Sequence, residues 1–398
     1  MSLFDPFAAV ANPFAAFAAA RAAGGALPGV PPYPELASAL YLFRHAQVSA
    51  ALRHPKLLQA PPGTYQAVRT QMVAHRVWAV LTRSMMLADP PYHGALRRPL
   101  VGAIGPGRLA ALNQAMRAEA ASLVSALVAH GRCEAVGELA VPFVVRSLER
   151  VLGMALPETK ALRRATATIA TALDLRREPA SDASDQACGW LMAEIDASIA
   201  RGELAPDGVA AAMLAEERAG RWERADVIAN LVFAIMAGQE TTIDVFGNAL
   251  LLLHAAPEQR DLLDRRAIGW TQAAEELLRM GPAVHYAVAR IAAEDFELDG
   301  VAVPAGSGVV AVVASANRDH EVYPQGDSLD LQSAPRNIMT FGSGIHSCFG
   351  QHLARLEIAI LLEALFAGAP AWRVDADSVT HRPMLSFHGP VAVPLSLG

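Results

Sequence analysis

Charge and cysteine are both scarce in this 398-residue chain, and each scarcity excludes a class of protein. Charged residues make up only 18%, and 33 Lys and Arg against 39 Asp and Glu leave a net charge of −6. Binding nucleic acid by neutralising phosphates needs an excess of basic residues, so we expect no nucleic-acid partner. Three cysteines are too few for a disulfide framework and fit a reducing compartment. The 53% of hydrophobic residues excludes disorder over the whole chain.

Long uninterrupted hydrophobic runs are also missing. The first apolar stretch, Phe7–Ala20, is broken by Asn12-Pro13, and no basic segment precedes it as one would in a signal peptide. The longest later stretch, Val227–Ala237, carries Asn230 and is too short to cross a bilayer. We therefore expect a soluble protein of the cytoplasm with no membrane anchor.

The order of patterns along the chain predicts a mainly α protein with a small β-rich lobe. Residues 1–35 are rich in Ala and Pro and predict an irregular segment that prolines interrupt. Apolar residues three and four apart dominate residues 108–278, which include a long helix at 225–255 with Asp226 as its N-cap. Alternating residues around Asp299-Gly300 predict a β-hairpin. No linker or internal repeat divides the chain, so we expect a single domain.

A glycine-rich loop, Phe341–Gly350, contains the most informative residue, Cys348. Together with the helix that follows it, this loop makes up residues 341–365, and a helix N-terminus favours a negatively charged sulfur. Gly342 and Gly350 let the backbone come close to a flat group. No Cys or His stands nearby at the spacing of a zinc site. A single thiolate of this kind fits the axial position of a haem iron.

The alternative for Cys348 is a buried free cysteine in a turn, which is the usual state of a lone cysteine. We assign that state to Cys133 and Cys188, which lie in helical segments without such a loop. For Cys348, the spacing of aromatic, glycine and histidine residues around it favours a metal ligand.

This loop resembles the haem-binding loop of the cytochrome P-450 family, and the resemblance extends over nearly the whole chain. It implies the cytochrome P-450 fold in a single domain, 1–398, with haem b (iron protoporphyrin IX) as cofactor. The resemblance makes Cys348 the iron ligand. It also places Phe341, Gly342 and Gly350 in contact with the cofactor.

A second motif, Ala237-Gly-Gln-Glu-Thr-Thr242, lies inside the long predicted helix. Ala237 and Gly238 leave room on one helix face for a small ligand and a substrate, and the Thr241 hydroxyl can bond to the carbonyl four residues earlier. The alternative is a buried helix weakened by glycine, and the motif alone does not decide between the two. By the resemblance, Ala237 and Gly238 lie against the cofactor. Thr241 then contacts bound oxygen and Glu240 supplies protons, which makes these two the catalytic residues.

Four basic side chains from separate segments are predicted to hold the two haem propionates. His93 and Arg97 stand four residues apart and therefore share a helix face, and charge-assisted hydrogen bonds to a carboxylate explain their types. A solvated face is the more common state of such a pair taken alone. Arg290 and His346 complete the set by the resemblance.

Glu276 and Arg279 lie three residues apart on a predicted helix and could form an ordinary surface pair. The resemblance instead makes them a buried structural network that supports the cysteine loop. The chain departs from the family pattern at two positions. Ser333 stands where the family has an arginine of this network, with Arg336 as the candidate substitute. Ile338 stands where many relatives have a histidine for a propionate.

The substrate pocket is predicted to be lined by apolar or soft side chains, so the substrate should be largely apolar. Each of these residues could equally belong to the ordinary core. They are Met85, Met86, Phe233, Met236, Ala237, Tyr286 and Leu385.

The resemblance implies an oxidoreductase, a monooxygenase that hydroxylates or epoxidises an apolar secondary metabolite, terpenoid, steroid or polyketide with one oxygen atom of O2. No flavin or iron–sulfur segment accompanies the haem region. We therefore expect a monomer that receives NAD(P)H-derived electrons from a separate ferredoxin and ferredoxin reductase. Arg98, Arg336 and Arg355 are the candidate docking residues.

Two alternatives to this function stay open. The first is a haem-thiolate peroxygenase, isomerase or oxidative-coupling enzyme, which has less need of the Glu240–Thr241 pair. The second is a haem-binding sensor or a helical interaction module without catalysis, in which Thr241 has no role.

Overall fold

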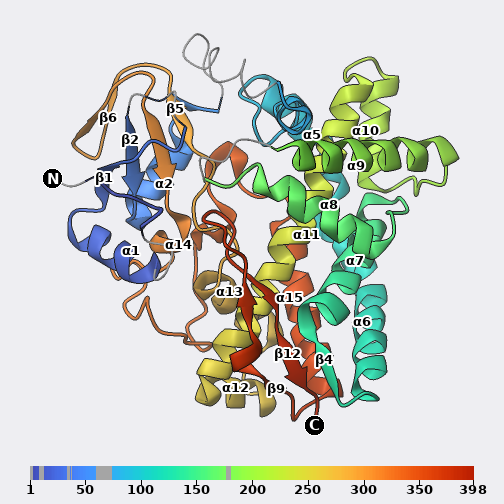
Figure 1. Cartoon of the computed structure of the whole chain (residues 1–398). Coiled ribbons are helices and arrows are strands. Elements are labelled where there is room, and N and C mark those ends of the chain that lie inside the picture. Colours follow the sequence, from blue (N-terminus) through green and yellow to red (C-terminus); the bar gives the residue numbers. More distant parts are fainter. Residues whose placement is uncertain (1–2, 9–12, 34–35, 37, 60–73, 176–180) are drawn as a thin grey trace.

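The computed structural model describes residues 3–8, 13–33, 36, 38–59, 74–175 and 181–398. Helices fill one side of the molecule, and most strands gather with the N-terminus on the other (Figure 1). The helices are α1 (Pro13–Ala22), α2 (His45–Arg53), α4 (Arg76–Leu81), α5 (Tyr92–Ala103), α6 (Pro106–Val128), η1 (Ala135–Ala140), α7 (Val141–Leu152), α8 (Thr159–Thr171), α9 (Asp182–Arg201), α10 (Val209–Arg218), α11 (Arg224–Ala255), α12 (Pro257–Asp264), α13 (Trp270–Met280), α14 (Val313–Ala316), η2 (Met339–Phe341), η3 (Gly344–His346), α15 (Gln351–Gly368) and η4 (Ala376–Ser378).

The strands form four small sheets in the described part of the chain. The largest has the order β1-β2-β8-β5-β3, in which β2 and β8 are parallel and the other neighbours antiparallel. The other sheets are β4-β12-β9, β10-β11 and the hairpin β6-β7. The strands are β1 (Ala26–Gly29), β2 (Ala39–Leu42), β3 (Leu57–Leu58), β4 (Arg132–Glu134), β5 (Arg290–Ala292), β6 (Phe296–Leu298), β7 (Val301–Val303), β8 (Gly308–Ala311), β9 (Arg373–Val374), β10 (Thr380–His381), β11 (Pro390–Ala392) and β12 (Pro394–Ser396).

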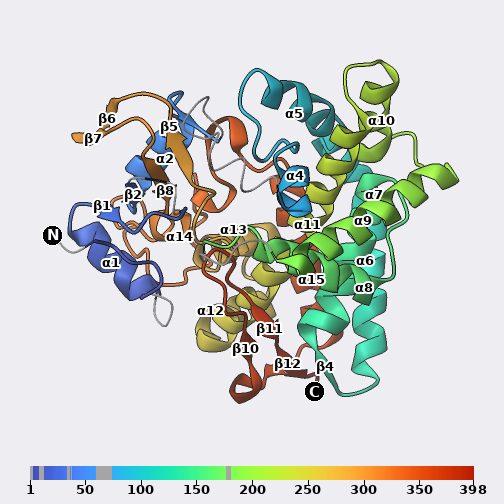
Figure 2. The same ribbon diagram turned by 45° about the horizontal axis from the view of Figure 1, so that its top comes forward.

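Helix α11 runs through the middle of the helical side, with α7, α8, α13 and α15 packed around it (Figure 2). Its 32 residues are mostly buried, as expected of a helix that is apolar nearly all round. The prediction of Asp226 as the N-cap is wrong, because the N-cap is Glu223. Asp226 lies in the first turn, where its carboxylate accepts a hydrogen bond from the backbone N–H of Glu223 at 2.9 Å.

The predicted mainly α fold with a small β-rich lobe is confirmed. The Asp299-Gly300 turn joins β6 to β7, with φ of 51° and 76° at the two residues. The predicted irregular segment 1–35 is more regular than expected, because β1 pairs with β2 and α1 packs nearby. Parts of that segment lie outside the described residues. Within the described ranges, every helix is too short or too polar to cross a bilayer.

The cysteine loop lies where the two sides of the molecule meet. Its Gly344 approaches the end of α2 so closely that an added Cβ would lie 2.5 Å from the carbonyl oxygen of Leu52. Helix α2 packs in turn on the five-stranded sheet, through Val48 and Leu52 among others. After the loop, α15 packs against α6, α11 and α13. The loop is therefore held by both sides of the fold.

Candidate functional site

Two glycines and one hydrogen bond shape the loop around Cys348. Gly342 and Gly344 have φ of 65° and 74°, a region that favours glycine because it has no Cβ. The backbone N–H of Cys348 donates to the carbonyl of Phe341 at 2.8 Å and closes the loop. Helix α15 begins soon afterwards, at Gln351, so the sulfur lies close to a helix N-terminus.

The surroundings of Cys348 combine burial with groups that favour an anion. Burial raises the pKa of its thiol, whereas a hydrogen bond from the backbone N–H of Gly350 and the charges of Arg97 and Arg355 oppose that rise. A metal cation at the sulfur would act in the same direction as these groups, because metals bind the thiolate. The donor set therefore fits a single axial thiolate on an iron.

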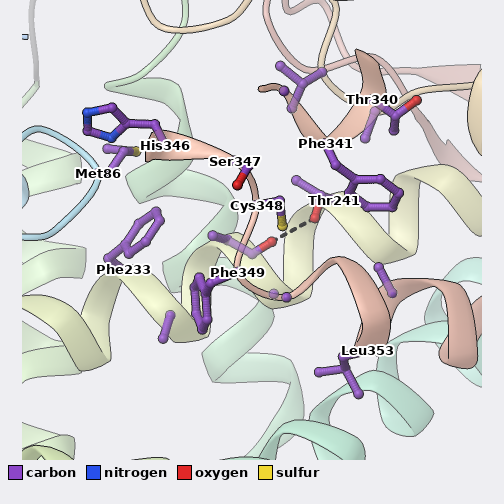
Figure 3. A pocket seen from close by; sticks show the side chains of 18 of the residues that line it. Met86, Phe233, Thr241, Thr340, Phe341, His346, Ser347, Cys348, Phe349 and Leu353 are labelled. Atoms are coloured by element: carbon purple, nitrogen blue, oxygen red, sulfur yellow. Dashed lines mark hydrogen bonds between the residues drawn. The ribbon is translucent and has the colours of Figure 1, made fainter. Parts of the chain in front are cut away.

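Cys348 lines a first cavity with an empty volume of about 1630 Å³, shared between the cysteine loop and α11. Figure 3 shows Cys348 on the loop and Thr241 on α11 beside this space. Every residue predicted to contact the cofactor lines it, although these residues come from separate segments of the chain. They are His93, Arg97, Ala237, Gly238, Arg290, Phe341, Gly342, His346, Cys348 and Gly350.

The four basic residues of this set form a cluster with no salt bridge to another described residue, although the charge of Asp89 acts on His93 and Arg290. The ring centroids of His93 and His346 are 4.3 Å apart, and Arg97 donates to the Ser347 hydroxyl at 3.4 Å. Nε2 of His93 is buried without a hydrogen bond. Burial and the charges of Arg290, His93 and Arg97 lower the pKa of His346 to about 3. Such a cluster fits a ligand with two carboxylates, as haem has.

On α11, the Thr241 hydroxyl donates to the carbonyl of Ala237 at 2.7 Å, the contact that the sequence predicts. Gly238 lines the first cavity beside Ala237, and it also meets a neighbouring helix. An added Cβ on Gly238 would lie 2.8 Å from Cδ2 of Leu148 on α7. This glycine therefore also allows α7 and α11 to pack closely.

Glu240 is buried among charges that the sequence did not reveal. Arg163 and the Thr166 hydroxyl, both on α8, donate to its Oε1, the latter at 2.7 Å. Arg382 donates to its Oε2 at 2.5 Å and also bonds to Asp244, one turn further along α11. The two arginines are 77 and 142 residues away in the chain, so no local pattern could identify them.

A second cavity, with an empty volume of about 790 Å³, adjoins the first and shares part of its wall. The residues lining both are Met86, Phe233, Ala237, Thr241, Val284, Ala287 and Val288. Of the other predicted pocket residues, Met85 lines the first cavity, and Met236 and Tyr286 line the second. Leu385 is not among the described residues that line these two cavities. It is buried in a hydrophobic cluster, while the nearby Phe387 reaches the second cavity.

Glu357 on α15 is a cavity residue that the sequence analysis did not single out. It lines the first cavity, and its Oε2 accepts a hydrogen bond from the Thr242 hydroxyl at 3.2 Å. Its Oε1 has no partner, and burial raises its pKa to about 8. Burial therefore favours the neutral form of this carboxyl group.

Glu276 and Arg279 form a buried ion pair, so they are not the surface pair that was the alternative. Nε of Arg279 donates to Glu276 at 2.7 Å, and the backbone N–H of Asp330 donates to the same carboxylate at 3.0 Å. Ser333 and Arg336 line a cavity beside the pair. Arg336 forms no ion pair with Glu276 among the described residues, so a backbone donor stands where a third charge was expected.

Comparison with known proteins places these features in one family. A family model described as cytochrome P-450 matches residues 270–367, a stretch that contains the buried ion pair and the cysteine loop. The chain is 30% identical over 397 residues to the vitamin D(3) 25-hydroxylase of Pseudonocardia autotrophica, covering 97% of this chain and 94% of that protein.

Two further likenesses span nearly the whole chain. The mycinamicin IV hydroxylase/epoxidase of Micromonospora griseorubida is 29% identical over 370 residues, which are 92% of this chain and 90% of that protein. The crystal structure of CalO2 matches with a TM-score of 0.89 and 26% identity, covering 100% of this chain and 99% of that one. The likeness therefore includes every element that lines the two cavities.

Proposed function

Because this chain belongs to the cytochrome P-450 family, it is a haem-thiolate monooxygenase, and we propose that it hydroxylates or epoxidises a largely apolar small molecule. The observation that carries this proposal is the second cavity, which adjoins Thr241 and has mostly apolar or soft walls. The side chains of this kind include Trp78, Met86, Phe233, Met236, Tyr286 and Phe387.

The substrate class is proposed from these walls and from the relatives. The two relatives described above are named for vitamin D(3) and for mycinamicin IV. We infer a substrate of comparable apolar character, namely a secondary metabolite of the terpenoid, steroid or polyketide kind.

We assign haem b to the first cavity, with Cys348 as the iron ligand. His93, Arg97, Arg290 and His346 hold the propionates, because these basic groups line the cavity and form no salt bridge with another described residue. Phe341, Gly342 and Gly350 bring the loop against the ring. The bound haem supplies the oxidising chemistry, and the protein supplies the thiolate, the orientation of the substrate and the exclusion of water.

Thr241 and Glu240 are proposed to hold and deliver protons on the α11 side. The Thr241 hydroxyl donates to Ala237 and keeps its lone pairs for a donor in the cavity. Glu240 lines the second cavity, yet both of its carboxylate oxygens accept hydrogen bonds from arginines. Arg163 and Arg382 therefore hold this carboxylate in place beside the cavity.

Electrons are proposed to pass from NAD(P)H through a ferredoxin reductase and a ferredoxin to a monomeric enzyme in the cytoplasm. Arg98 and Arg336 are exposed, and so is Ile345 in the cysteine loop, at 49%. Arg355 is not free for docking, because it pairs with both carboxylate oxygens of Glu275. The docking surface should therefore centre on the first three residues.

The test begins with a library of steroids, terpenoids and macrolides, screened for shifts of the ferric Soret band of the haem-loaded protein. Compounds that shift the band are then incubated with O2, NADPH, ferredoxin and reductase, or with hydrogen peroxide alone. We expect oxygenated product with the electron donors. Rapid turnover with peroxide alone would identify a peroxygenase instead. A protein that remains colourless despite ample haem precursor would overturn the proposal.

A further inference from the structure

One hydroxyl group in the wall of the second cavity has no partner in the protein, and it belongs to Tyr286. This residue is 4% exposed and lines the second cavity. Its hydroxyl forms no hydrogen bond with another described residue, whereas the hydroxyl of a buried tyrosine usually has a partner. The oxygen is not sealed within the protein either, so it faces the space of the cavity. Such an unused donor indicates a ligand that accepts from it.

The ring of Tyr286 is held in place by two aromatic neighbours. The ring centroids of Tyr286 and Phe17 are 5.7 Å apart with an interplanar angle of 84°, and those of Tyr286 and Tyr41 are 6.5 Å apart at 90°. Edge-to-face contacts of this kind fix the plane of the ring. The Tyr41 hydroxyl donates to the carbonyl of Val30 at 2.8 Å, so its own proton is already used. The Tyr286 hydroxyl is therefore held in position before a ligand arrives.

Other polar side chains of the second cavity are engaged within the chain. Asp174 accepts a hydrogen bond from the backbone N–H of Ser386 at 2.7 Å, Glu240 accepts from two arginines, and Thr241 donates to a backbone carbonyl. Of the described residues that line this cavity, only Asp174 and Glu240 carry charge, and both are acids. A carboxylate ligand would find no cation among them, whereas a neutral oxygen needs only a donor.

Tyr286 lies in the part of the second cavity that is not shared with the first. Its neighbours Val284, Ala287 and Val288 line both cavities, and so does Thr241. Tyr286 is among the described residues that line the second cavity but not among those that line the first. A molecule bonded to its hydroxyl therefore has its opposite end directed toward Thr241 and the first cavity.

We propose that Tyr286 is a specificity-determining residue whose hydroxyl donates a hydrogen bond to a neutral oxygen of the substrate, at the end remote from the oxidised carbon. The acceptor is a carbonyl, ether or hydroxyl oxygen on an otherwise apolar skeleton. Burial raises the pKa of Tyr286, and Tyr41 acts in the same direction, so the phenol keeps its proton at neutral pH. This inference rests on the proposed function, because it narrows the substrate class of the same cavity.

The first test uses pairs of compounds that differ only in one carbonyl group. They are androstan-3-one and androstane, menthone and menthane, and cyclododecanone and cyclododecane. The affinity of each for the haem-loaded protein is measured from the shift of the ferric Soret band. For the ketones that bind, Tyr286→Phe should weaken binding about tenfold, because one hydrogen bond is lost. The affinity for the matching hydrocarbon should stay the same, since the ring of Tyr286 is kept.

A carboxylate probe tests whether the acceptor is neutral. Dodecanoic acid and its methyl ester have the same apolar chain and differ in charge. Tyr286→Phe should weaken binding of the ester, and it should leave binding of the acid unchanged. A loss confined to the acid would show that the hydroxyl accepts a carboxylate, which contradicts the neutral acceptor.

The matched control for these titrations is Tyr41→Phe. It removes a buried tyrosine hydroxyl beside the same ring, and Tyr41 is not among the described residues that line the two cavities. It should leave the affinity for ketones unchanged. Tyr286→Phe should keep the free energy of unfolding, because its hydroxyl has no bond in the protein to lose. Equal loss of affinity for ketone and hydrocarbon in Tyr286→Phe, or no loss for either, would overturn the inference.

The second test determines where the acceptor oxygen lies, with the ketone whose affinity falls most. The infrared C=O band of the isotope-labelled ketone should lie at lower frequency in the wild type than in Tyr286→Phe, because a hydrogen bond weakens the carbonyl bond. With O2, NADPH, ferredoxin and reductase, the wild type should oxygenate the carbons most distant from the carbonyl. The variant should spread its products over the skeleton. A main wild-type product oxygenated next to the carbonyl, or the same band in both proteins, would contradict the inference.

These outcomes separate the inference from the proposed function. A wild-type protein that oxygenates ketones and hydrocarbons alike, with unchanged affinities in Tyr286→Phe, keeps the proposed function and contradicts only the role of Tyr286. A haem-loaded wild type whose Soret band none of these compounds shifts contradicts the proposed class of apolar substrates, and with it the inference.

Discussion

The two sides of the adjoining cavities differ in whether their charged side chains are paired. On the cysteine side, basic side chains converge without a salt bridge to any described residue, and Nε2 of His93 is buried with no hydrogen bond. On the α11 side, Glu240 is fully paired inside the chain, by Arg163 and Arg382. Unpaired buried groups indicate a ligand that completes them, whereas paired groups stabilise the protein by themselves. The cysteine side is therefore arranged to hold a cofactor, whereas the charged groups of the α11 side satisfy one another within the chain.

The largest expected effect is on the cysteine side. Cys348→Ala should abolish the red-shifted Soret band of the ferrous carbon-monoxide complex, because that band requires a thiolate on the iron. Absorption spectra of the purified variant check this. Cys133→Ala and Cys188→Ala are the matched controls and should keep the band, since neither thiol lines the first cavity. An unaltered band in Cys348→Ala would show that Cys348 is not the iron ligand.

A second, smaller effect should appear on the α11 side as stability. Arg163→Ala leaves the buried carboxylate of Glu240 with one guanidinium in place of two. We expect the free energy of unfolding to fall by about 2 kcal/mol, measured by urea denaturation followed with circular dichroism. Arg164→Ala, at the exposed neighbouring position, should change it by less than about 0.5 kcal/mol. The rate of haem dissociation should stay the same in both variants. Faster release from Arg163→Ala would contradict the proposed difference between the two sides.

The cysteine side should respond to charge removal in the converse manner. Arg97→Gln should release haem about tenfold faster, because one charge-assisted hydrogen bond to a propionate is lost. The measurement is haem transfer to an excess of apomyoglobin. Arg98→Gln removes the exposed neighbour of Arg97 and should leave the rate unchanged. His93→Phe should also speed release without lowering the free energy of unfolding, since the buried Nε2 has no protein partner to lose. Equal rates for Arg97→Gln and Arg98→Gln would refute the propionate assignment.

The smallest effect is a change in how stability depends on pH. The folded-state pKa of Asp244, about 7, lies above its ordinary value of 3.8. Between these values the folded chain binds more protons than the unfolded chain. The contribution of this group is therefore full below pH 3.8 and is lost as pH rises through about 7. Asp244→Asn should remove this decline in the free energy of unfolding. The slope of the decline against pH corresponds to a difference of at most about one bound proton per molecule.

Urea denaturation at a series of pH values measures that decline. Asp264→Asn is the control, because Asp264 pairs with Arg260 at a partly exposed position and should leave the pH dependence unchanged. An identical pH dependence in the wild type and in Asp244→Asn would show that Asp244 is ionised in the fold.

The same contrast explains what could be predicted from the sequence. The cysteine side depends on consecutive residues around Cys348, so its motif is readable in one short stretch, and the resemblance added the basic residues from other segments. The α11 motif placed Thr241 correctly, since its bond to Ala237 is local. The partners of Glu240 could not be predicted, because α8 and the segment 382–389 meet α11 only in three dimensions.

Other misses have the same physical origin. Gly238 was expected to leave room for a ligand, but the close contact of α7 through Leu148 was not foreseen. Leu385 has the right composition for a pocket residue, yet the path of its segment turns it into the core. Asp226 matches the preference for an N-cap, but Glu223 takes that position and Asp226 completes the capping box. Side-chain type alone does not specify which neighbour it meets.

Gly344, pressed against the carbonyl of Leu52, has a mechanical consequence. Through this contact and α2, the sulfur is braced against the five-stranded sheet, on the opposite side of the fold from α8 and α9. A displacement of α8 or α9 would therefore leave this support of the thiolate in place. Because of this separation, the walls of the second cavity can change in evolution and bind new substrates without altering the thiolate site.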